Sequence, residues 1–302
     1  MYLHHHKAAG TSTKNCLVTT AAANERKIGI MLSSHGRSIL ERSGHGIPHP
    51  LQADIFMGGY AFGICEGITD RPCSYFTILR DPYERLISSY SYCRRARTDQ
   101  ICSALGANDV SIAEWAQHQG SFFFQQLLFD PVVCSKNLLS NQTLFSLNGI
   151  QHDIAGRSKR TNPLGSAPCW FRQKVAMHNT VNKIQSEALL KYCLEHLENW
   201  FSVIGLVEEY DASLALLEGV YGLPFTKCAS GTAVNKNDYL NLKLQSMAAS
   251  AESTVSLLKR QLEQDPKVRE ALRFDIKLYQ RAKQIFGEQK KAFAHMFPKR
   301  NI

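Results

Sequence analysis

The sequence predicts an α/β protein built as a single domain, in which helices flank a mostly parallel sheet. Short apolar runs, typical of parallel strands buried on both faces, alternate with helical segments along the 302 residues. No internal repeat is evident and no linker divides the chain, whose length is sufficient for a large core. We therefore expect one domain that spans residues 1–302.

The N-terminal segment has the pattern of a short strand, a tight loop and a helix. The strand is expected at residues 2–3, and the hydroxyl residues at positions 11–13 are suited to cap a helix that continues towards Ala23. The segment after this helix is rich in Gly, Ser and His and carries little periodicity. A second strand is expected at residues 53–57, directly before two glycines.

The clearest strand covers residues 75–79, YFTIL, and it runs directly into a helix start. Asp81 suits the N-cap position, Pro82 the first helical position and Glu84 the third. A glutamate at the third position can accept from the N-cap backbone N–H, so we expect a complete capping box here.

The rest of the chain predicts four further helices and one strand. Helices are expected over residues 111–129 and 182–197, and a last core strand at 201–206 precedes a helix at 211–220. Near the C-terminus, apolar residues recur every three or four positions and predict an amphipathic helix of about five turns. These residues are Val268, Leu272, Ile276, Tyr279, Ala282 and Phe286.

Positive charge is concentrated at the C-terminus. The net charge is +9, and residues 267–302 contain ten Lys/Arg but only three Asp/Glu. Such a segment attracts polyanions, which include nucleic acid, an anionic glycan and an anionic membrane surface. A solvated helix face with a basic end explains the same charges equally well, so composition alone leaves the partner open.

Nine cysteines are present, and their spacing indicates no metal centre. There is no C-x-x-C pair and no Cys/His array at zinc spacing, so we expect no structural metal. The odd count fits either reduced, buried thiols or a few disulfides with some thiols left over. Asn141 begins a glycosylation sequon, which matters only if the chain enters the secretory pathway.

Two loops carry residue types suited to bind phosphate groups. In residues 7–12, KAAGTS, a lysine and two hydroxyls lie at a helix start, where backbone N–H groups point outwards. Arg80 ends a strand and can bind a phosphate through two N–H groups, while Ser88 lies further along the next helix. Each loop also has an ordinary explanation, because such turns often open helices and Arg80 could form an ion pair with a nearby acid.

Together, the two loops resemble the nucleotide-binding motifs of the membrane-associated carbohydrate sulfotransferases, which include the heparan and chondroitin sulfotransferases. The stretch YLHHHKAAGTS resembles the family pattern FLHIPKTGGTS, and LRDPYERLISSY resembles LRDPVERFLSxY. The resemblance continues in FSVIGLVEEYDASLALLEGVYGLP and FDIKLYQRAKQIF, so it extends in order over nearly the whole chain. It also indicates that the three histidines before Lys7 are native sequence rather than a tag.

The resemblance implies a P-loop-like sulfotransferase fold and the donor 3′-phosphoadenylyl sulfate (PAPS). The residues implied for binding of its 5′-phosphosulfate are Lys7, Ala8, Ala9, Gly10, Thr11 and Ser12. Lys7 would also stabilise charge on the bridging oxygen as the S–O bond breaks, while Arg80 and Ser88 would hold the 3′-phosphate and select this donor over ATP. Sulfuryl transfer, like phosphoryl transfer, depends largely on positioning and electrostatics. Because the sulfuryl group carries less charge than a phosphoryl group, no metal ion is required.

The chain departs from the family where a general base is expected. Similar members carry a histidine in a G-H-F-P-F-G-like stretch, which here reads GGYAFG, so that Gly59 stands in its place. Glu66 is the first alternative because it follows the same strand, and His6 is the second because it adjoins the loop lysine. Other upstream histidines are at positions 5, 35, 45 and 49, and each is also explained as a solvated loop residue.

A second departure lies within the first loop, where Ala8 and Ala9 replace the usual Thr-Gly. This exchange removes one hydroxyl contact and some backbone freedom. Backbone N–H groups supply much of such a loop's binding capacity, so we expect donor binding to survive the change.

The expected activity is therefore sulfuryl transfer from PAPS to a carbohydrate or glycosaminoglycan hydroxyl, with nucleic acid not expected as a partner. The alternative is a relative that has lost its base and binds a nucleotide or a glycan without turnover. A P-loop kinase is disfavoured, because neither the G-x-x-x-x-G-K order nor a metal-binding Asp after an apolar strand is present.

The resemblance also implies a location in the Golgi lumen, since animal members of the family are anchored in the Golgi membrane. This chain begins almost on its first expected strand, which leaves no room for an anchor, and it has no run of about 18 apolar residues. We therefore expect a lumenal catalytic domain without an anchor in this chain.

Overall fold

The computed structural model describes eight parts of the chain. These are residues 1–31, 54–59, 62, 73–96, 102, 110–127, 183–228 and 248–296. Glu66, the Asn141 sequon, the histidines at positions 35, 45 and 49, and the last basic residues lie outside the described residues.

The centre of the molecule is a five-stranded sheet with the order β2-β3-β1-β4-β5. Every pairing in it is parallel, which confirms the α/β class and the parallel sheet expected from the sequence. The strands are β1 (Tyr2–Leu3), β2 (Ile28–Met31), β3 (Ile55–Gly58), β4 (Tyr75–Leu79) and β5 (Phe201–Leu206). Because β1 lies between β3 and β4, the loops that leave these three strands emerge side by side at one edge.

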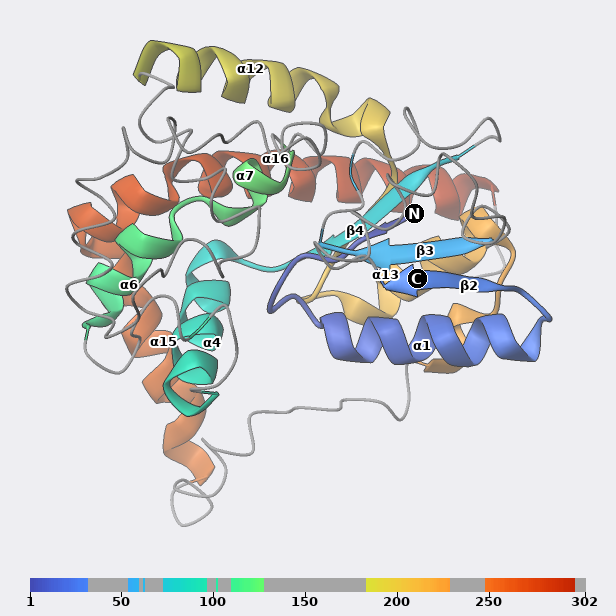
Figure 1. Ribbon diagram of the computed structural model, residues 1–302, viewed down its shortest axis with the longest axis horizontal. Coiled ribbons are helices and arrows are strands. Elements are labelled where there is room, and N and C mark those ends of the chain that lie inside the picture. The colour runs from blue at the N-terminus through green and yellow to red at the C-terminus, as the bar shows by residue number, and fades with distance from the viewer. Residues whose placement is uncertain are drawn as a thin grey trace, which may run out of the picture.

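Helices cover the sheet on both sides, with α1 along one face and α12 and α16 along the other (Figure 1). A separate group formed by α4, α6 and α15 lies beside the sheet and is joined to it by α16. The bounds are α1 (Gly10–Ala23), α4 (Pro82–Arg95), α6 (Ile112–Gln119), α7 (Phe122–Leu127), α12 (Lys183–Trp200), α13 (Tyr210–Tyr221), the 3₁₀ turn η2 (Phe225–Cys228), α15 (Ala248–Gln264) and α16 (Pro266–Met296).

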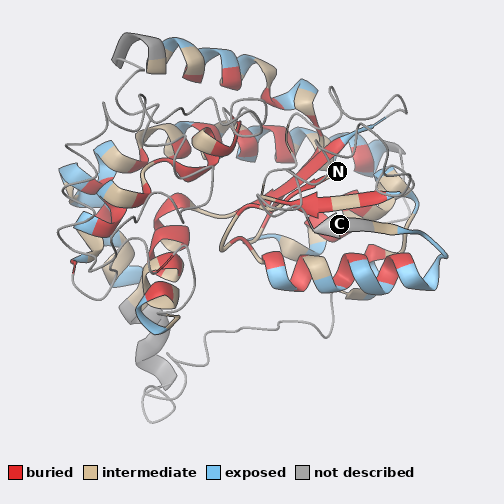
Figure 2. Cartoon of the chain, in the orientation of Figure 1, coloured by how far each residue is buried: buried red, intermediate tan, exposed pale blue. Residues whose placement is uncertain are grey.

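Two apolar cores stabilise this arrangement, and the buried residues in Figure 2 follow the strands and the inward helix faces. The larger core packs the sheet against α1, α13 and α16, and Leu3, Ile78 and Ile204 are almost completely buried in it. The smaller core holds α4, α6, α15 and α16 together around Trp115, which is fully buried. Burying such side chains contributes about 1.5–3 kcal/mol each. Residues of α16 lie in both cores, so this helix stabilises both.

Two predicted elements differ from the structure, and two further elements, β2 and α15, were not predicted. The helix expected over residues 111–129 is two helices, because Gly120 ends α6 with a φ of 58°, a conformation that glycine adopts readily. The strand β2 was not predicted, since its four residues lie in a segment without clear periodicity. The C-terminal helix α16 has 31 residues and extends well beyond the predicted stripe, with Phe293 still buried.

The capping box predicted at the start of α4 is only half present. The Asp81 side chain accepts hydrogen bonds from the backbone N–H groups of Tyr83 and Glu84, both at 3.1 Å. The backbone N–H of Asp81, however, donates to Oε1 of Glu208 at 2.8 Å instead of to Glu84. The loop after β5 therefore completes the cap, which ties β4 and β5 together just beyond their carboxyl ends.

The cysteines include both disulfides and a thiol. Disulfides join Cys16 to Cys228 and Cys93 to Cys102. Cys193 is a buried thiol on α12, and burial raises its pKa to about 12, so it stays protonated. Of the two alternatives that the odd count left open, disulfides with a remaining thiol are therefore the one found among the described residues.

Candidate functional site

The loop between β1 and α1 is built from two residues with left-handed backbone. Lys7 has a φ of 67° and Ala9 a φ of 53°, and between them the Ala8 N–H donates to the His5 carbonyl at 3.2 Å. This tight turn reverses the chain so that α1 begins immediately at Gly10. The first loop therefore presents a helix N-terminus at the carboxyl end of the sheet.

The hydroxyl cap predicted for α1 is wrong. The N-cap residue is Ala9, which has no side chain able to cap, and Thr13 instead donates its hydroxyl back to the Ala9 carbonyl at 3.0 Å. No side chain among the described residues caps the N–H groups of the first turn. Such N–H groups, together with the helix dipole, favour an anion at this position.

His4 lies directly over this helix start. A Cβ atom added to Gly10 would lie 1.7 Å from His4 Nε2, so only glycine allows the imidazole to occupy this place. Burial, followed by the charges of Lys14 and Lys7, lowers the pKa of His4 to about 4. The ring is therefore neutral at physiological pH and adds no positive charge to the loop.

Lys7 connects the first loop to the helix of the second. Its Nζ lies 4.2 Å from the ring centroid of Tyr92 on α4. Ser88 lies one helical turn before Tyr92 on α4, so both side chains project from the same face of that helix. The structure therefore brings Lys7 and the α4 face that carries Ser88 to the same side of the sheet edge.

Arg80 follows β4 directly and is engaged by an acid of α4. Its Nε and Nη2 donate to Oε2 of Glu84 at 3.4 Å and 3.2 Å. Lys259 of α15 contacts Asp81 at 3.0 Å and Glu84 at 3.5 Å, so these four residues form one charged network. The ion-pair explanation considered for Arg80 is thus the arrangement found. A guanidinium has five N–H donors, so this pairing still leaves donors for an anion.

Neither candidate base receives clear support. Glu66 lies outside the described residues. The His6 ring lies between Tyr92 and Phe122, with centroids 6.1 Å and 6.3 Å away. Burial, with the nearby charge of Lys7, lowers its pKa well below the usual value, so the His6 ring is neutral at physiological pH.

Gly59, at the position where the family pattern has a histidine, lies directly after β3. A Cβ atom there would make only ordinary contacts, 3.6 Å from Gln126 Nε2 and from the His4 carbonyl oxygen. The Gly59 carbonyl accepts a hydrogen bond from Gln126 Nε2 at 3.1 Å. The backbone at Gly59 is therefore held in place by α7.

Gln126 is a site residue that the sequence reasoning missed. Its Nε2 donates to the carbonyls of His4 and Gly59, both at 3.1 Å, and its Oε1 lies 2.7 Å from His5 Nδ1. One side chain of α7 thus joins the ends of β1 and β3. The available signal was a pair of glutamines after three phenylalanines, since polar side chains in such an apolar run need partners when buried.

Arg85, also missed, is a fully buried guanidinium on α4. Its Nη1 donates to Gln119 Oε1 at 3.4 Å, whereas Nε and Nη2 have no hydrogen-bond partner among the described residues. Asp275 of α16 is equally buried and accepts the backbone N–H groups of Phe123 at 3.1 Å and Phe124 at 2.9 Å. Burial raises the pKa of Asp275 while the Arg85 charge lowers it, and burial lowers the pKa of Arg85.

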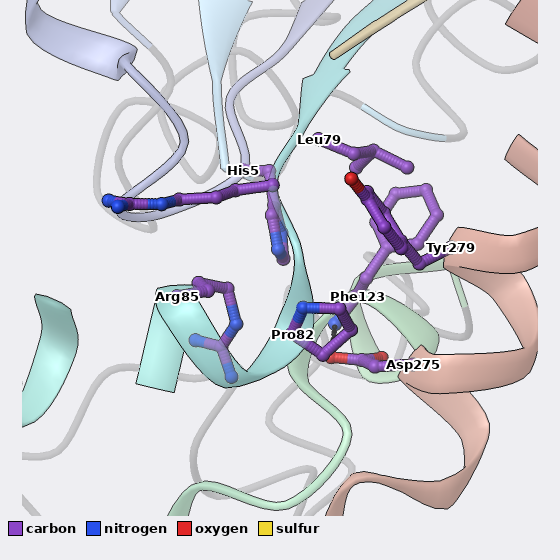
Figure 3. Close-up of a pocket in the computed structure, with 8 residues that line it drawn as sticks. His5, Leu79, Pro82, Arg85, Phe123, Asp275 and Tyr279 are labelled. Carbon is purple, nitrogen blue, oxygen red and sulfur yellow. Dashed lines mark hydrogen bonds between the residues drawn. The ribbon is translucent and has the colours of Figure 1, made fainter. Parts of the chain in front are cut away.

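A small, partly open pocket lies beside these groups (Figure 3). It is lined by His5, Leu79, Arg80, Pro82, Arg85, Phe123, Asp275 and Tyr279. The pocket therefore connects the ends of β1 and β4 with α4, α7 and α16, and its lining includes Arg80 of the second loop and Arg85 of α4.

Comparisons with known proteins add no assignment. No family model matches the chain, and no curated protein matches it. Within the described parts of the chain, no three His, Cys, Asp or Glu residues gather as metal ligands would, and no helix is both long and apolar enough to cross a bilayer.

Proposed function

We propose that the protein is a sulfotransferase, with a P-loop-like sulfotransferase fold, that transfers the sulfuryl group of PAPS to a carbohydrate or glycosaminoglycan hydroxyl. The observation that carries this proposal is the contact between Lys7 and Tyr92, which brings the two motif-bearing segments together at the carboxyl edge of a parallel sheet. Ligands of open α/β sheets bind at this edge.

The first loop suits the 5′-phosphosulfate. The uncapped N–H groups at the start of α1 are the donors that a doubly charged group of this kind requires. Residues 7–12 would surround it, and the Lys7 ammonium would offset the negative charge that develops on the bridging oxygen. The left-handed backbone at Lys7 and Ala9 shapes this turn without the glycine of the family pattern at position 9.

The second loop suits the 3′-phosphate, with Arg80 and Ser88 as ligands. In this arrangement the phosphate joins the network of Arg80, Glu84 and Lys259, whose lysine adds a second positive charge. Glu84 repels an anion, so we expect Arg80 to shift towards the phosphate when the donor binds.

The alternative function, binding of a nucleotide or glycan without turnover, is favoured by one specific observation. Gly59, at the position where the family pattern has its histidine, supplies no base. This alternative shares the donor site with the enzyme and differs only in turnover.

A Golgi lumenal location is part of the proposal. The disulfides Cys16–Cys228 and Cys93–Cys102 support it, since disulfides persist in the oxidising secretory pathway and are rare in the cytosol.

Calorimetric titration with 3′-phosphoadenosine 5′-phosphate (PAP) tests the donor site. We expect micromolar binding that ATP does not compete away and that Lys7→Ala and Arg80→Ala each weaken at least tenfold, or about 1.4 kcal/mol. Lys191→Ala is the matched control, because Lys191 is an exposed lysine on α12 that pairs with Glu195, outside both donor loops. Absence of PAP binding by folded wild-type protein would overturn the proposal, and binding without sulfuryl transfer to any acceptor would favour the alternative.

A further inference from the structure

Gln126 fixes the tautomer of His5. Both acceptors of its Nε2 are backbone carbonyls, of His4 and Gly59, so the amide can face only one way. Its Oε1 must then accept a hydrogen from His5 Nδ1 at 2.7 Å. Neutral His5 therefore carries its proton on Nδ1 and leaves the lone pair of Nε2 without a proton.

Arg85 supplies the complementary groups. His5 is 2% exposed and Arg85 is 0% exposed, and both line the pocket that Figure 3 shows. Arg85 Nε and Nη2 are donors without a partner among the described residues. Buried donors of this kind are rare, because leaving one unsatisfied is energetically costly. The pocket thus contains unused donors as well as a neutral acceptor.

A hydroxyl group matches this combination. It donates one hydrogen, as His5 Nε2 requires, and its oxygen accepts, as Arg85 requires. A carboxylate or a phosphate lacks the hydrogen for Nε2, and an ammonium would face the Arg85 charge. The enclosed part of the pocket takes a group about the size of a water molecule, and its lining also includes the partly exposed Arg80 and Tyr279.

We propose that this pocket is the subsite for the acceptor hydroxyl, in which His5 Nε2 receives the hydroxyl hydrogen and Arg85 donates to the hydroxyl oxygen. The inference rests on the proposed sulfotransferase function and names a base in place of the histidine that is absent at Gly59. His5 precedes Lys7 by two positions, so the subsite adjoins the loop proposed for the phosphosulfate.

The chemical step balances with these groups alone. The hydroxyl oxygen forms the new O–S bond, the bond between sulfur and the bridging oxygen breaks, and PAP leaves with that electron pair. The hydroxyl proton passes to His5 Nε2 and then to solvent. The proton on the acceptor hydroxyl becomes strongly acidic only as the O–S bond forms. A weak base therefore suffices if it is already in place. Burial and the Arg85 charge lower the pKa of His5 to about 3, which keeps Nε2 available at every physiological pH.

The first test is the tautomer of His5, measured by nitrogen NMR on protein labelled in its histidines. We expect protonated Nδ1 and bare Nε2 between about pH 5 and pH 8, the range in which an ordinary histidine titrates. The charged or titratable groups that contact or influence His5 are His4 and His6 on its own segment, Arg85 on α4, and Asp275 on α16. A proton on Nε2, or titration of His5 within this range, would overturn the subsite.

The second test separates the subsite from the donor site. Sulfate release from PAPS is measured with water as acceptor and with desulfated glycosaminoglycans, alongside PAP affinity. His5→Phe keeps an aromatic ring beside Phe122 and Phe123 but has no lone pair. We expect it to lower turnover about 100-fold or more while PAP affinity changes little, whereas His196→Phe on α12 leaves both unchanged.

Three other results of these measurements would each overturn a different part of the proposals. Wild-type turnover by His5→Phe would overturn the subsite and leave the sulfotransferase proposal standing. PAP binding without sulfate transfer to water or to any glycan would overturn the subsite and favour the binding module. A folded wild-type protein that does not bind PAP would overturn the sulfotransferase function, and with it the subsite.

Discussion

The Nε2 atom of Gln126 donates a hydrogen bond to the carbonyl of Gly59 at 3.1 Å, and α7 thereby holds the end of β3. The same nitrogen holds the end of β1 through the His4 carbonyl. The sheet edge that carries the candidate site is thus supported from outside the sheet, by a helix that follows it in the chain. The geometry of both strand ends depends on this one amide.

Replacing Gln126 by leucine should destabilise the protein by about 1–3 kcal/mol, because two carbonyls and the His5 N–H lose their partner at a buried position. Denaturant unfolding measures this change. The adjacent Gln125→Leu is the control, since Gln125 makes a single 3.4 Å hydrogen bond to the Gln119 carbonyl and should cost clearly less. Equal losses would show that the Gln126 network contributes nothing specific.

Gly10→Ala should weaken PAP binding and lower stability by about 1–3 kcal/mol, as the new methyl group overlaps the His4 ring. Calorimetry and thermal unfolding report the two effects. Gly287→Ala on α16 is the matched glycine control, because a Cβ there meets nothing within 4 Å. That variant should be stabilised by up to about 1 kcal/mol, as alanine is the better helix former. Tolerance of Gly10→Ala would contradict the close approach of His4.

Ala9→Gly should stabilise the protein by about 0.5–1 kcal/mol. Ala9 has a φ of 53°, and the left-handed region costs a residue with a Cβ about 1–2 kcal/mol, part of which glycine loses again through its freer unfolded chain. The midpoint of urea unfolding provides the measurement. Destabilisation by this change would show that the alanine methyl packs well enough to outweigh the strain.

Acidification should destabilise the protein below about pH 6.5. His5 has a folded pKa of about 3 and His4 of about 4, both below the value of 6.5 in an unfolded chain. The unfolded state therefore binds more protons in this interval, and each histidine removes about 1.4 kcal/mol per pH unit as pH falls from 6.5 towards its folded pKa. The raised pKa of Asp275 acts in the opposite direction.

Urea unfolding at several pH values in this interval measures the slope. His5→Phe should reduce the slope by roughly one histidine's share, whatever its effect on stability at neutral pH. An unaltered slope in His5→Phe would mean that His5 is not held neutral by burial.

Elements determined by neighbouring residues were predictable from the sequence. The strand at 75–79 and the Asp81 N-cap are confirmed, since an apolar run and a capping side chain act within a few positions. The other half of that cap was wrong because Glu208, a residue from beyond β5, reaches the Asp81 N–H. Ser111, by contrast, forms a complete capping box with Glu114, which uses only local contacts.

The positions of the two loops of the candidate site were predictable from the sequence, but the contacts of its buried side chains were not. Loop composition indicated the positions of Lys7 and Arg80, both of which lie at the expected sheet edge. The roles of Gln126 and Arg85 depend on contacts with residues far away in the sequence, such as the His4 carbonyl, and on burial by α16. Local pattern indicates only that the Gln126 side chain needs partners and does not identify them, so the folded chain is needed to reveal both roles.

The disulfide between Cys16 and Cys228 closes a covalent ring, since its ends are 212 positions apart. Four strands of the sheet, β2 to β5, originate within this ring, and α1 is fastened to η2 across it. A protease that cuts the chain once between the two cysteines would therefore leave a single covalent molecule. Such a nick would become visible only when the sample is reduced, when the protein would separate into two polypeptides.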